Sequence, residues 1–102
     1  MTEVRAAALA EVLPGQPHLV IVNDTRLVLV RVGDRIHAIN DSCAHSGGPL
    51  SGGKLSGTRL ACPYHGWMYD VRTGQCVLPS RGAAVPTYAV RVEGDDIFVE
   101  LP

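Results

Sequence analysis

The chain has 102 residues, of which 46% are hydrophobic and 5% aromatic, with a net charge of −1 and a pI of about 6.4. This length fits one domain with a modest core, which must be mainly aliphatic because aromatic residues are few. The near-neutral charge gives no electrostatic reason to expect a nucleic acid or an anionic membrane as a partner.

Cysteine usage and targeting segments bear on the compartment. Two of the three cysteines lie in a candidate metal motif described below, so a disulfide framework is not available and a reducing environment is favoured. We interpret the third, Cys76, as a small hydrophobic residue of a strand. The sequence shows no signal peptide and no stretch long enough to span a bilayer, so we expect a cytoplasmic protein without a membrane partner.

Residues 1–10 allow two interpretations. The run Ala6–Leu9 favours a helix. In an all-β fold the same region would instead form a strand at about Val4–Ala8, followed by a loop through Pro14 and Gly15.

Residues 18–40 indicate three consecutive strands. Each is an apolar or β-branched run bounded by turn residues, and the three are His18–Val22, Leu27–Val32 and Arg35–Asn40. Turns are expected at residues 23–24 and 33–34. We expect the first strand to be buried. In the third, alternation places Ile36 and Ala38 on one face and His37 and Ile39 on the other.

Residues 41–86 indicate loops and small hairpins. A loop is expected at 41–53, followed by a hairpin of Lys54–Ser56 with Arg59–Ala61. A second hairpin pairs Trp67–Val71 with Gln75–Leu78, and a loop rich in small residues follows at 79–86.

The C-terminal residues indicate one more hairpin. We expect a strand at Tyr88–Glu93 with Tyr88, Val90 and Val92 facing inward, and a turn at 94–95. The returning strand Ile97–Leu101 should bury its alternate apolar residues. Short strands with turns between them suggest a β-sandwich or small barrel, in which the hairpin-rich segment is an insertion.

Two stretches carry the chemistry, Cys43-Ala44-His45 and Cys62-Pro63-Tyr64-His65, with sixteen residues between His45 and Cys62. Most zinc sites pair like with like, but here each stretch offers one thiol and one imidazole. That mixture suits a two-iron, two-sulfide cluster in which two thiolates hold one iron and two imidazoles the other. A structural zinc site on the same four residues is the alternative.

Glycines adjoin both stretches, at Gly47, Gly48 and Gly66, and would let the backbone approach the sulfides of such a cluster. The remaining histidines, His18 and His37, lie on expected strands away from the motif. We interpret them as solvated or edge-strand residues and not as ligands.

The stretches CAHSGGPLSGG and CPYHGWMYDVRTG, with the ending YAVRVEGDDIFVEL, resemble the Rieske ferredoxins over nearly the whole chain. The resemblance implies one all-β domain over residues 1–102, a Rieske-type β-sandwich or small barrel with a cluster-binding subdomain at about 41–80. It therefore favours the N-terminal strand over the helix. It also implies a [2Fe–2S] cluster held by Cys43, His45, Cys62 and His65.

The resemblance further implies which residues surround the cluster. Pro79 matches the proline of a third loop that covers the cluster, and Tyr69 matches a tyrosine whose hydroxyl donates to a cysteine sulfur. Trp67 either covers the cluster side or is an ordinary core aromatic. The imidazole-bearing iron would lie near the surface, so we expect a docking face at Ser46, Pro49 and Leu50, with Trp67 and Pro79 beside it.

High-potential members of the family carry a disulfide at the positions of Gly48 and Tyr64, and a serine donor at the position of Trp67. The chain lacks both features. We therefore expect a low-potential cluster, at roughly −150 to 0 mV on a range that reaches about +300 mV.

The chain offers little other chemistry. It has no nucleophile beside a base and no phosphate-binding or dinucleotide-binding motif, and the facial triad of a mononuclear iron oxygenase needs ligands that it lacks. We therefore expect an electron carrier, not an enzyme. The resemblance implies a monomer that passes electrons from an NAD(P)H-dependent flavoprotein reductase to a terminal oxygenase acting on aromatic compounds. The alternatives are a small subunit of an NAD(P)H nitrite reductase and a zinc-stabilised binding module.

Overall fold

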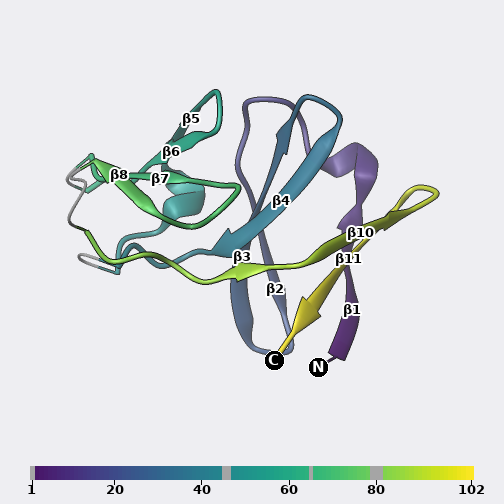
Figure 1. Cartoon of the computed structure of the whole chain (residues 1–102). Helices are drawn as coiled ribbons and strands as arrows, with labels where there is room; N and C mark the ends of the chain where they lie inside the picture. Colours follow the sequence, from purple (N-terminus) through teal and green to yellow (C-terminus); the bar gives the residue numbers. More distant parts are fainter. Residues whose placement is uncertain (1, 45–46, 65, 79–81) are drawn as a thin grey trace.

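The structure is a computed structural model that describes residues 2–44, 47–64, 66–78 and 82–102 (Figure 1). These residues form eleven strands and two short 3₁₀ helices. The N-terminal strands are β1 (Thr2–Ala8), β2 (His18–Val22), β3 (Thr25–Val32) and β4 (Arg35–Asn40). The middle strands are β5 (Lys54–Ser56), β6 (Arg59–Ala61), β7 (Met68–Asp70) and β8 (Cys76–Leu78). The C-terminal strands are β9 (Thr87–Tyr88), β10 (Val90–Glu93) and β11 (Asp96–Leu101), and the 3₁₀ helices are η1 (Leu9–Glu11) and η2 (Leu50–Gly52).

The strands form three antiparallel sheets, in the orders β1-β11-β10, β2-β3-β4-β9 and β5-β6-β7-β8. The first two make the larger part of the molecule, and both chain ends lie there, away from the third sheet (Figure 1). The third sheet leaves the larger part after β4 and returns to it at β9, which pairs with β4. The expected insertion of the hairpin-rich segment into an all-β fold is therefore confirmed.

Strand β3 separates two apolar cores. Leu27 and Leu29 face a core that contains Ile97 and Val99 of β11. Val28 and Val30 face the opposite way, into a core shared with the third sheet. All four β3 residues are fully buried, which explains why the strand reads as a continuous apolar run. Strand β4 obeys the expected alternation, because Ile36 and Ala38 enter the first core and Ile39 enters the second.

The N-terminal region forms the expected strand and not a helix. β1 pairs with β11 along its length, and helical preference survives only in the single turn η1, at residues expected to form a loop. The Glu11 carboxylate accepts the Ala8 N–H at 2.8 Å and so stabilises the start of that turn.

Two expectations about burial are wrong. β2 was expected to be buried, but only Val20 is; Ile21 is 57% exposed because β2 ends its sheet and pairs only with β3. Val92 was expected to face the core, but it is 43% exposed and lines an open groove instead. The strand expected at 88–93 is also interrupted at Ala89. Before this residue β9 pairs with β4, and after it β10 pairs with β11.

The hairpins of the third sheet agree with the sequence. β5 and β6 have the expected bounds, whereas β7 and β8 are each shorter than expected. In the described part of the chain no helix is long and apolar enough to cross a membrane.

Candidate metal centre

Cys43 opens a short loop after β4. Its N–H donates to the Gly48 carbonyl at 2.9 Å, and its carbonyl accepts the Gly47 N–H at 2.7 Å. Gly47 has a φ of +71°, a conformation that favours glycine. A Cβ at Gly47 would meet nothing within 4 Å, so the requirement for glycine comes from backbone conformation and not from crowding.

Cys62 opens a second loop with the same pattern, directly after β6. Its N–H donates to the Trp67 carbonyl at 2.7 Å, and its carbonyl accepts the Gly66 N–H at 3.0 Å. Gly66 has a φ of +73°. The two loops are therefore near copies in their backbone hydrogen bonds, although the histidine follows the cysteine by two residues in one loop and by three in the other.

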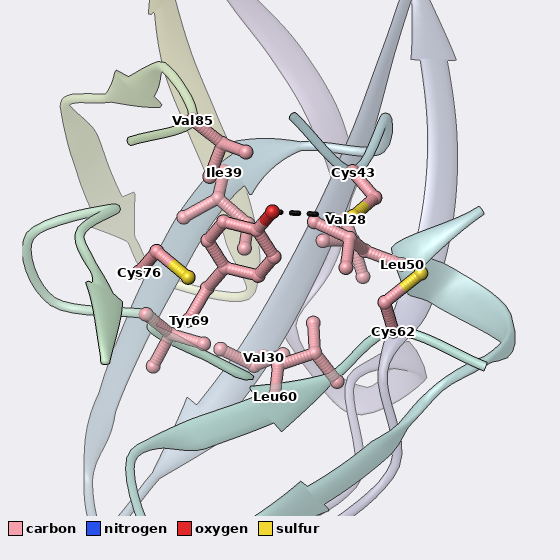
Figure 2. Close-up of a cluster of buried hydrophobic side chains, with 11 residues drawn as sticks. Val28, Val30, Ile39, Cys43, Leu50, Leu60, Cys62, Tyr69, Cys76 and Val85 are labelled. Carbon is pink, nitrogen blue, oxygen red and sulfur yellow. Dashed lines mark hydrogen bonds between the residues drawn. The ribbon is translucent and has the colours of Figure 1, made fainter. Parts of the chain in front are cut away.

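Both cysteine side chains are buried, with 3% of Cys43 and 2% of Cys62 exposed. They belong to one apolar cluster together with Leu50, Leu60 and Tyr69 (Figure 2). Two thiols in one water-poor site can act together as metal ligands, because a bound metal ion deprotonates the thiols that coordinate it.

The two loops touch at Gly48. A Cβ at this position would lie 2.8 Å from Cδ2 of Tyr64 and 3.1 Å from Sγ of Cys62. Only glycine lets the first loop come this close to the second cysteine without a shift of its neighbours. The Tyr64 ring lies against Gly48 and is 61% exposed. Gly48 and Tyr64, the positions at which the resemblance implies a disulfide in high-potential members, therefore face each other here.

A second close approach follows at the end of the first loop. A Cβ at Gly53 would clash with the carbonyl oxygen of Ala61, the last residue of β6. The backbone that leaves the first loop is thus packed directly against the backbone that leads to Cys62.

Tyr69 reaches from β7 to the first loop. Its hydroxyl lies 3.1 Å from Cys43 Sγ and accepts the Ala44 N–H at 3.1 Å (Figure 2). Burial raises the pKa of Tyr69, and the contact with Cys43 raises it further, so the hydroxyl keeps its proton. It can therefore donate to a Cys43 thiolate, and the Tyr69 hydroxyl lies where the expected donation to a cysteine sulfur requires it.

Asp41 closes the base of the first loop and was missed by sequence reasoning. It is 2% exposed, and its carboxylate accepts the Ser51 N–H at 2.7 Å. Its carbonyl accepts the Leu50 N–H at 2.7 Å. Nothing in the sequence distinguishes Asp41 from a solvated turn residue, because Ser51, whose N–H its carboxylate accepts, lies ten residues away.

Leu50 was expected on the docking face, and this is wrong. Its side chain is fully buried in the cluster that contains the cysteines, because η2 packs against β3. Pro49, the residue before it, is half-buried and remains available at the surface.

Trp67 packs against the apolar cluster and also meets the third loop. A Cβ at Gly82 would lie 2.7 Å from Cζ3 of Trp67 and 2.5 Å from Sγ of Cys76. Cys76 is 7% exposed within the same cluster, as expected for a small hydrophobic residue. Because this apolar cluster also contains Cys43 and Cys62, the packing of Trp67 is compatible with both roles considered for it.

Four of the residues singled out from the sequence lie outside the described residues, namely His45, Ser46, His65 and Pro79. His37 is described and half-buried on β4, where it lines an open groove of about 580 Å³ with Tyr88 and Val92. Burial lowers the pKa of His37, and the charge of Arg35 lowers it further. The lining residues of this groove do not include the cysteines.

Comparison with known proteins gives consistent matches. The ferredoxin subunit of 3-phenylpropionate/cinnamic acid dioxygenase from Escherichia coli (strain K12) is 34% identical over 103 residues, which cover 100% of this chain and 96% of that protein. The ferredoxin of carbazole 1,9a-dioxygenase from Nocardioides aromaticivorans IC177 is 35% identical, with 97% of each chain covered and a TM-score of 0.90. A chain from the complex of reduced oxygenase and oxidised ferredoxin in carbazole 1,9a-dioxygenase is 28% identical. It matches with a TM-score of 0.86 over 95% of this chain and 91% of that chain.

The described residues fit an iron–sulfur cofactor. Two buried thiols lie on matched loops, and a protonated hydroxyl lies within hydrogen-bonding distance of one sulfur. The Rieske [2Fe-2S] domain model matches residues 2–89, so the chain belongs to the Rieske [2Fe-2S] family and its cofactor is a Rieske-type [2Fe–2S] cluster.

Proposed function

We propose that this protein is an electron-transfer ferredoxin. It takes one electron from an NAD(P)H-dependent flavoprotein reductase and passes it to the terminal oxygenase of a system that oxidises aromatic compounds. The ferredoxin relatives at 34% and 35% identity and the likeness to a chain of a ferredoxin–oxygenase complex support this role. The chain is then a carrier component, and the oxygenase performs the catalysis.

The proposal assigns the ligands to the two loops. Cys43 and Cys62 hold one iron, and His45 and His65 hold the other. The observation that carries this assignment is the matched pair of loops, each of which presents a buried thiol to the same cluster of side chains. When bound, the [2Fe–2S] group accepts and returns a single electron.

The chain's own residues set the surroundings of that group. The apolar side chains around the thiols exclude water, which strengthens every charge interaction in the site. Tyr69 donates to the Cys43 sulfur and so favours the electron-rich reduced state. The loop contact at Gly48 has no disulfide, and position 67 has no hydroxyl, so the potential belongs at the low end of the Rieske range.

The docking face is proposed at the imidazole edge, with Ser46, Pro49 and Pro79 around the two histidines. Leu50 is no longer part of it because its side chain is buried. The proposal also includes a cytoplasmic monomer with one domain, residues 1–102, whose cluster-binding part is about residues 41–80. The return of the third sheet to the larger part of the molecule through the β4–β9 pair supports this division.

The two alternatives have less support. A nitrite reductase small subunit would be a stable part of an enzyme complex, but the relatives with the identities given above are ferredoxins of dioxygenases. A zinc-stabilised module conflicts with the family to which the chain belongs.

Reconstitution tests the proposal. The purified protein, loaded with its cluster, is mixed with an NAD(P)H-dependent flavoprotein reductase and the terminal oxygenase of an aromatic dioxygenase system. Product formation should require all three proteins, and the absorption of the ferredoxin should bleach on reduction and recover on transfer. A colourless protein that binds zinc, or one that is reduced but passes no electron to any oxygenase offered, would contradict the role.

A further inference from the structure

Asp41 is a buried carboxylate for which the proposed function has no use. Among the described residues it is the only charged residue that is buried, with 2% of its surface exposed. Burying a carboxylate without partners is unfavourable in free energy, so the contacts of Asp41 indicate its role. The Ser51 N–H donates to Oδ1 at 2.7 Å, and Nη2 of Arg26 lies 3.4 Å from Oδ2.

These contacts join the two ends of the first ligand loop to each other and to Arg26 of β3. Besides the Ser51 bond, the Asp41 carbonyl accepts the Leu50 N–H at 2.7 Å, and the Asp41 N–H donates to the Arg26 carbonyl at 3.1 Å. The next step inward is the bridge between Ser42 and Pro49, and the next is the bond from Cys43 to Gly48. The loop is therefore a ladder whose base is Asp41 and whose inner step is the cysteine.

The second ligand loop needs no such side chain. Its base is the pair Ala61–Met68, which belongs to the β6–β7 hairpin and is supported by strands on both sides. The first loop follows β4, and the far end of its ladder is the 3₁₀ helix η2 instead of a strand. The Asp41 carboxylate thus supports the first loop, as strand pairing supports the second.

We propose that Asp41 is a positioning residue of the cluster site, whose carboxylate oxygen holds the first ligand loop closed and so determines how firmly iron is retained through Cys43. This inference rests on the proposed ligand set. The hydrogen bond to Ser51 is the main contribution, because Arg26 is 54% exposed and its ion pair is screened by solvent. An acceptor oxygen at this position is therefore what matters, more than its charge.

Three variants of the cluster-loaded protein separate these contributions. Asp41→Ala removes the acceptor and leaves the Ser51 N–H buried without a partner. Asp41→Asn keeps an oxygen of the same reach and removes the charge. Arg26→Gln removes only the ion pair. Asp96→Ala is the matched control, since it breaks a carboxylate–arginine contact of 2.8 Å with Arg5 on the sheet far from the loops.

Two measurements are made on each variant. The first is the rate at which visible absorption decays in the presence of a chelator. The second is hydrogen exchange of the peptides that cover residues 41–51 and 61–68. Asp41→Ala should lose the cluster about tenfold faster, because the Ser51 N–H is left without an acceptor. Its exchange should rise in 41–51 and stay unchanged in 61–68. Asp41→Asn, Arg26→Gln and the control should stay within about threefold of the parent.

Several outcomes overturn the proposal. These are parent-like decay of Asp41→Ala, equal loosening of both peptides, or an Asp41→Asn variant as labile as Asp41→Ala. If Asp41→Ala does not fold, Asp41→Asn decides alone. Retention of the cluster, with residues 41–51 protected from hydrogen exchange, supports the role of Asp41 in holding the loop closed, which we call the Asp41 brace. Loss of the cluster or of that protection refutes it. Cys43→Ser distinguishes this failure from that of the ligand assignment. A Cys43→Ser protein that keeps its cluster refutes the assignment, whereas one without a cluster beside a parent-like Asp41→Ala refutes only the brace.

Discussion

The two ligand loops have the same backbone hydrogen bonds but different supports. The second loop extends the β6–β7 hairpin, so its shape follows from a sheet. The first loop follows β4 and is closed at its base by contacts of Asp41. The same ring of backbone hydrogen bonds around a cysteine is thus supported by a sheet in one loop and by backbone bonds together with one buried carboxylate in the other, so the two loops should fail in different ways.

The loops also differ at the residue after the turn glycine. In the first loop this residue is Gly48, which lets the backbone approach Cys62. In the second it is Trp67, which fills space in the apolar cluster. The first loop therefore needs the absence of a side chain at residue 48, and the second uses a large side chain at residue 67. A substitution at Gly48 tests a close approach, and one at Trp67 tests the filling of the apolar cluster.

The largest effect is expected at the cysteines, where the loops should be equivalent. Cys43→Ser and Cys62→Ser should each abolish the visible absorption and the reduced-state EPR signal, because a hydroxyl is a much weaker iron ligand than a thiolate. Cys76→Ser is the control, since this residue is also buried in the same apolar cluster. It should destabilise the protein modestly and keep both signals. Loss of the signals in Cys76→Ser but not in Cys43→Ser would show the ligand assignment to be wrong.

The next effect tests the contact between the loops. In Gly48→Ala the new Cβ must displace the Tyr64 ring and press on Cys62 Sγ, which we expect to cost about 1–2 kcal/mol. The midpoint of thermal cluster loss at a fixed scan rate should fall by about 5 °C or more. A second substitution, Tyr64→Ala, should recover part of this loss because the ring is the nearer obstacle.

Gly47→Ala is the control for that experiment. Its cost comes from a φ of +71° and not from a neighbour, so Tyr64→Ala should not relieve it. Equal rescue of both glycine variants by Tyr64→Ala would mean that Tyr64 acts on general stability and not on the contact at Gly48.

Most strands could be predicted because local turn chemistry defines them. β2, β4, β5 and β6 have the bounds expected from the sequence. Asn23 and Gly33 have positive φ values at the turns after β2 and β3, and Gly57 does so after β5. The motif residues and the contact of Tyr69 with a cysteine were also expected, because the family resemblance supplied their roles.

What could not be predicted depends on contacts between distant segments. An edge strand and a buried strand have the same apolar alternation, so the exposure of Ile21 is decided by β2 having only one neighbour. Leu50 looks like a surface loop residue until η2 is packed against β3. Asp41 looks like an ordinary turn residue until Ser51 is placed beside it.

A smaller effect is expected from the Tyr69 hydroxyl, which contacts the sulfur of Cys43 in the first loop. Tyr69→Phe keeps the buried ring and removes the donor to Cys43 Sγ. The reduced state then loses more stabilisation than the oxidised state, so the potential should fall by about 20–60 mV, equivalent to roughly 0.5–1.5 kcal/mol for one electron. Voltammetry of parent and variant measures this shift, and the parent should lie at roughly −150 to 0 mV.

The shift should not depend on pH around neutrality, because burial and Cys43 keep the pKa of the Tyr69 hydroxyl above its usual value. Tyr88→Phe is a matched control. Its hydroxyl accepts from Asn40 Nδ2 at 3.1 Å and has no place in the proposed site. An unchanged potential in Tyr69→Phe, or an equal shift in Tyr88→Phe, would mean that the Tyr69 hydrogen bond does not tune the cluster.

The smallest effect concerns a second aspartate, which lies just beyond the second loop and contrasts with Asp41. The Asp70 carboxylate accepts the Arg72 backbone N–H at 2.9 Å and its Nη2 at 2.8 Å, at the turn between β7 and β8. The hydrogen bond from the Arg72 side chain lowers the pKa of Asp70. A carboxyl group with a lowered folded-state pKa stabilises the fold above its unfolded pKa of about 3.9, and this contribution is lost as the pH falls through the folded value.

Because the Arg72 side chain is 58% exposed, solvent screens the pair, and the contribution should be small. Asp70→Asn should therefore lower the thermal midpoint near pH 7 by about 2 °C or less, and the difference from the parent should shrink below about pH 4. Retention of the cluster should be unchanged, since a sheet and not this carboxylate supports the second loop. Thermal midpoints of parent and variant between pH 3 and 7, with the chelator decay rate at pH 7, measure both effects. A decay rate in Asp70→Asn as fast as in Asp41→Ala would remove the contrast between a surface ion pair and a buried brace.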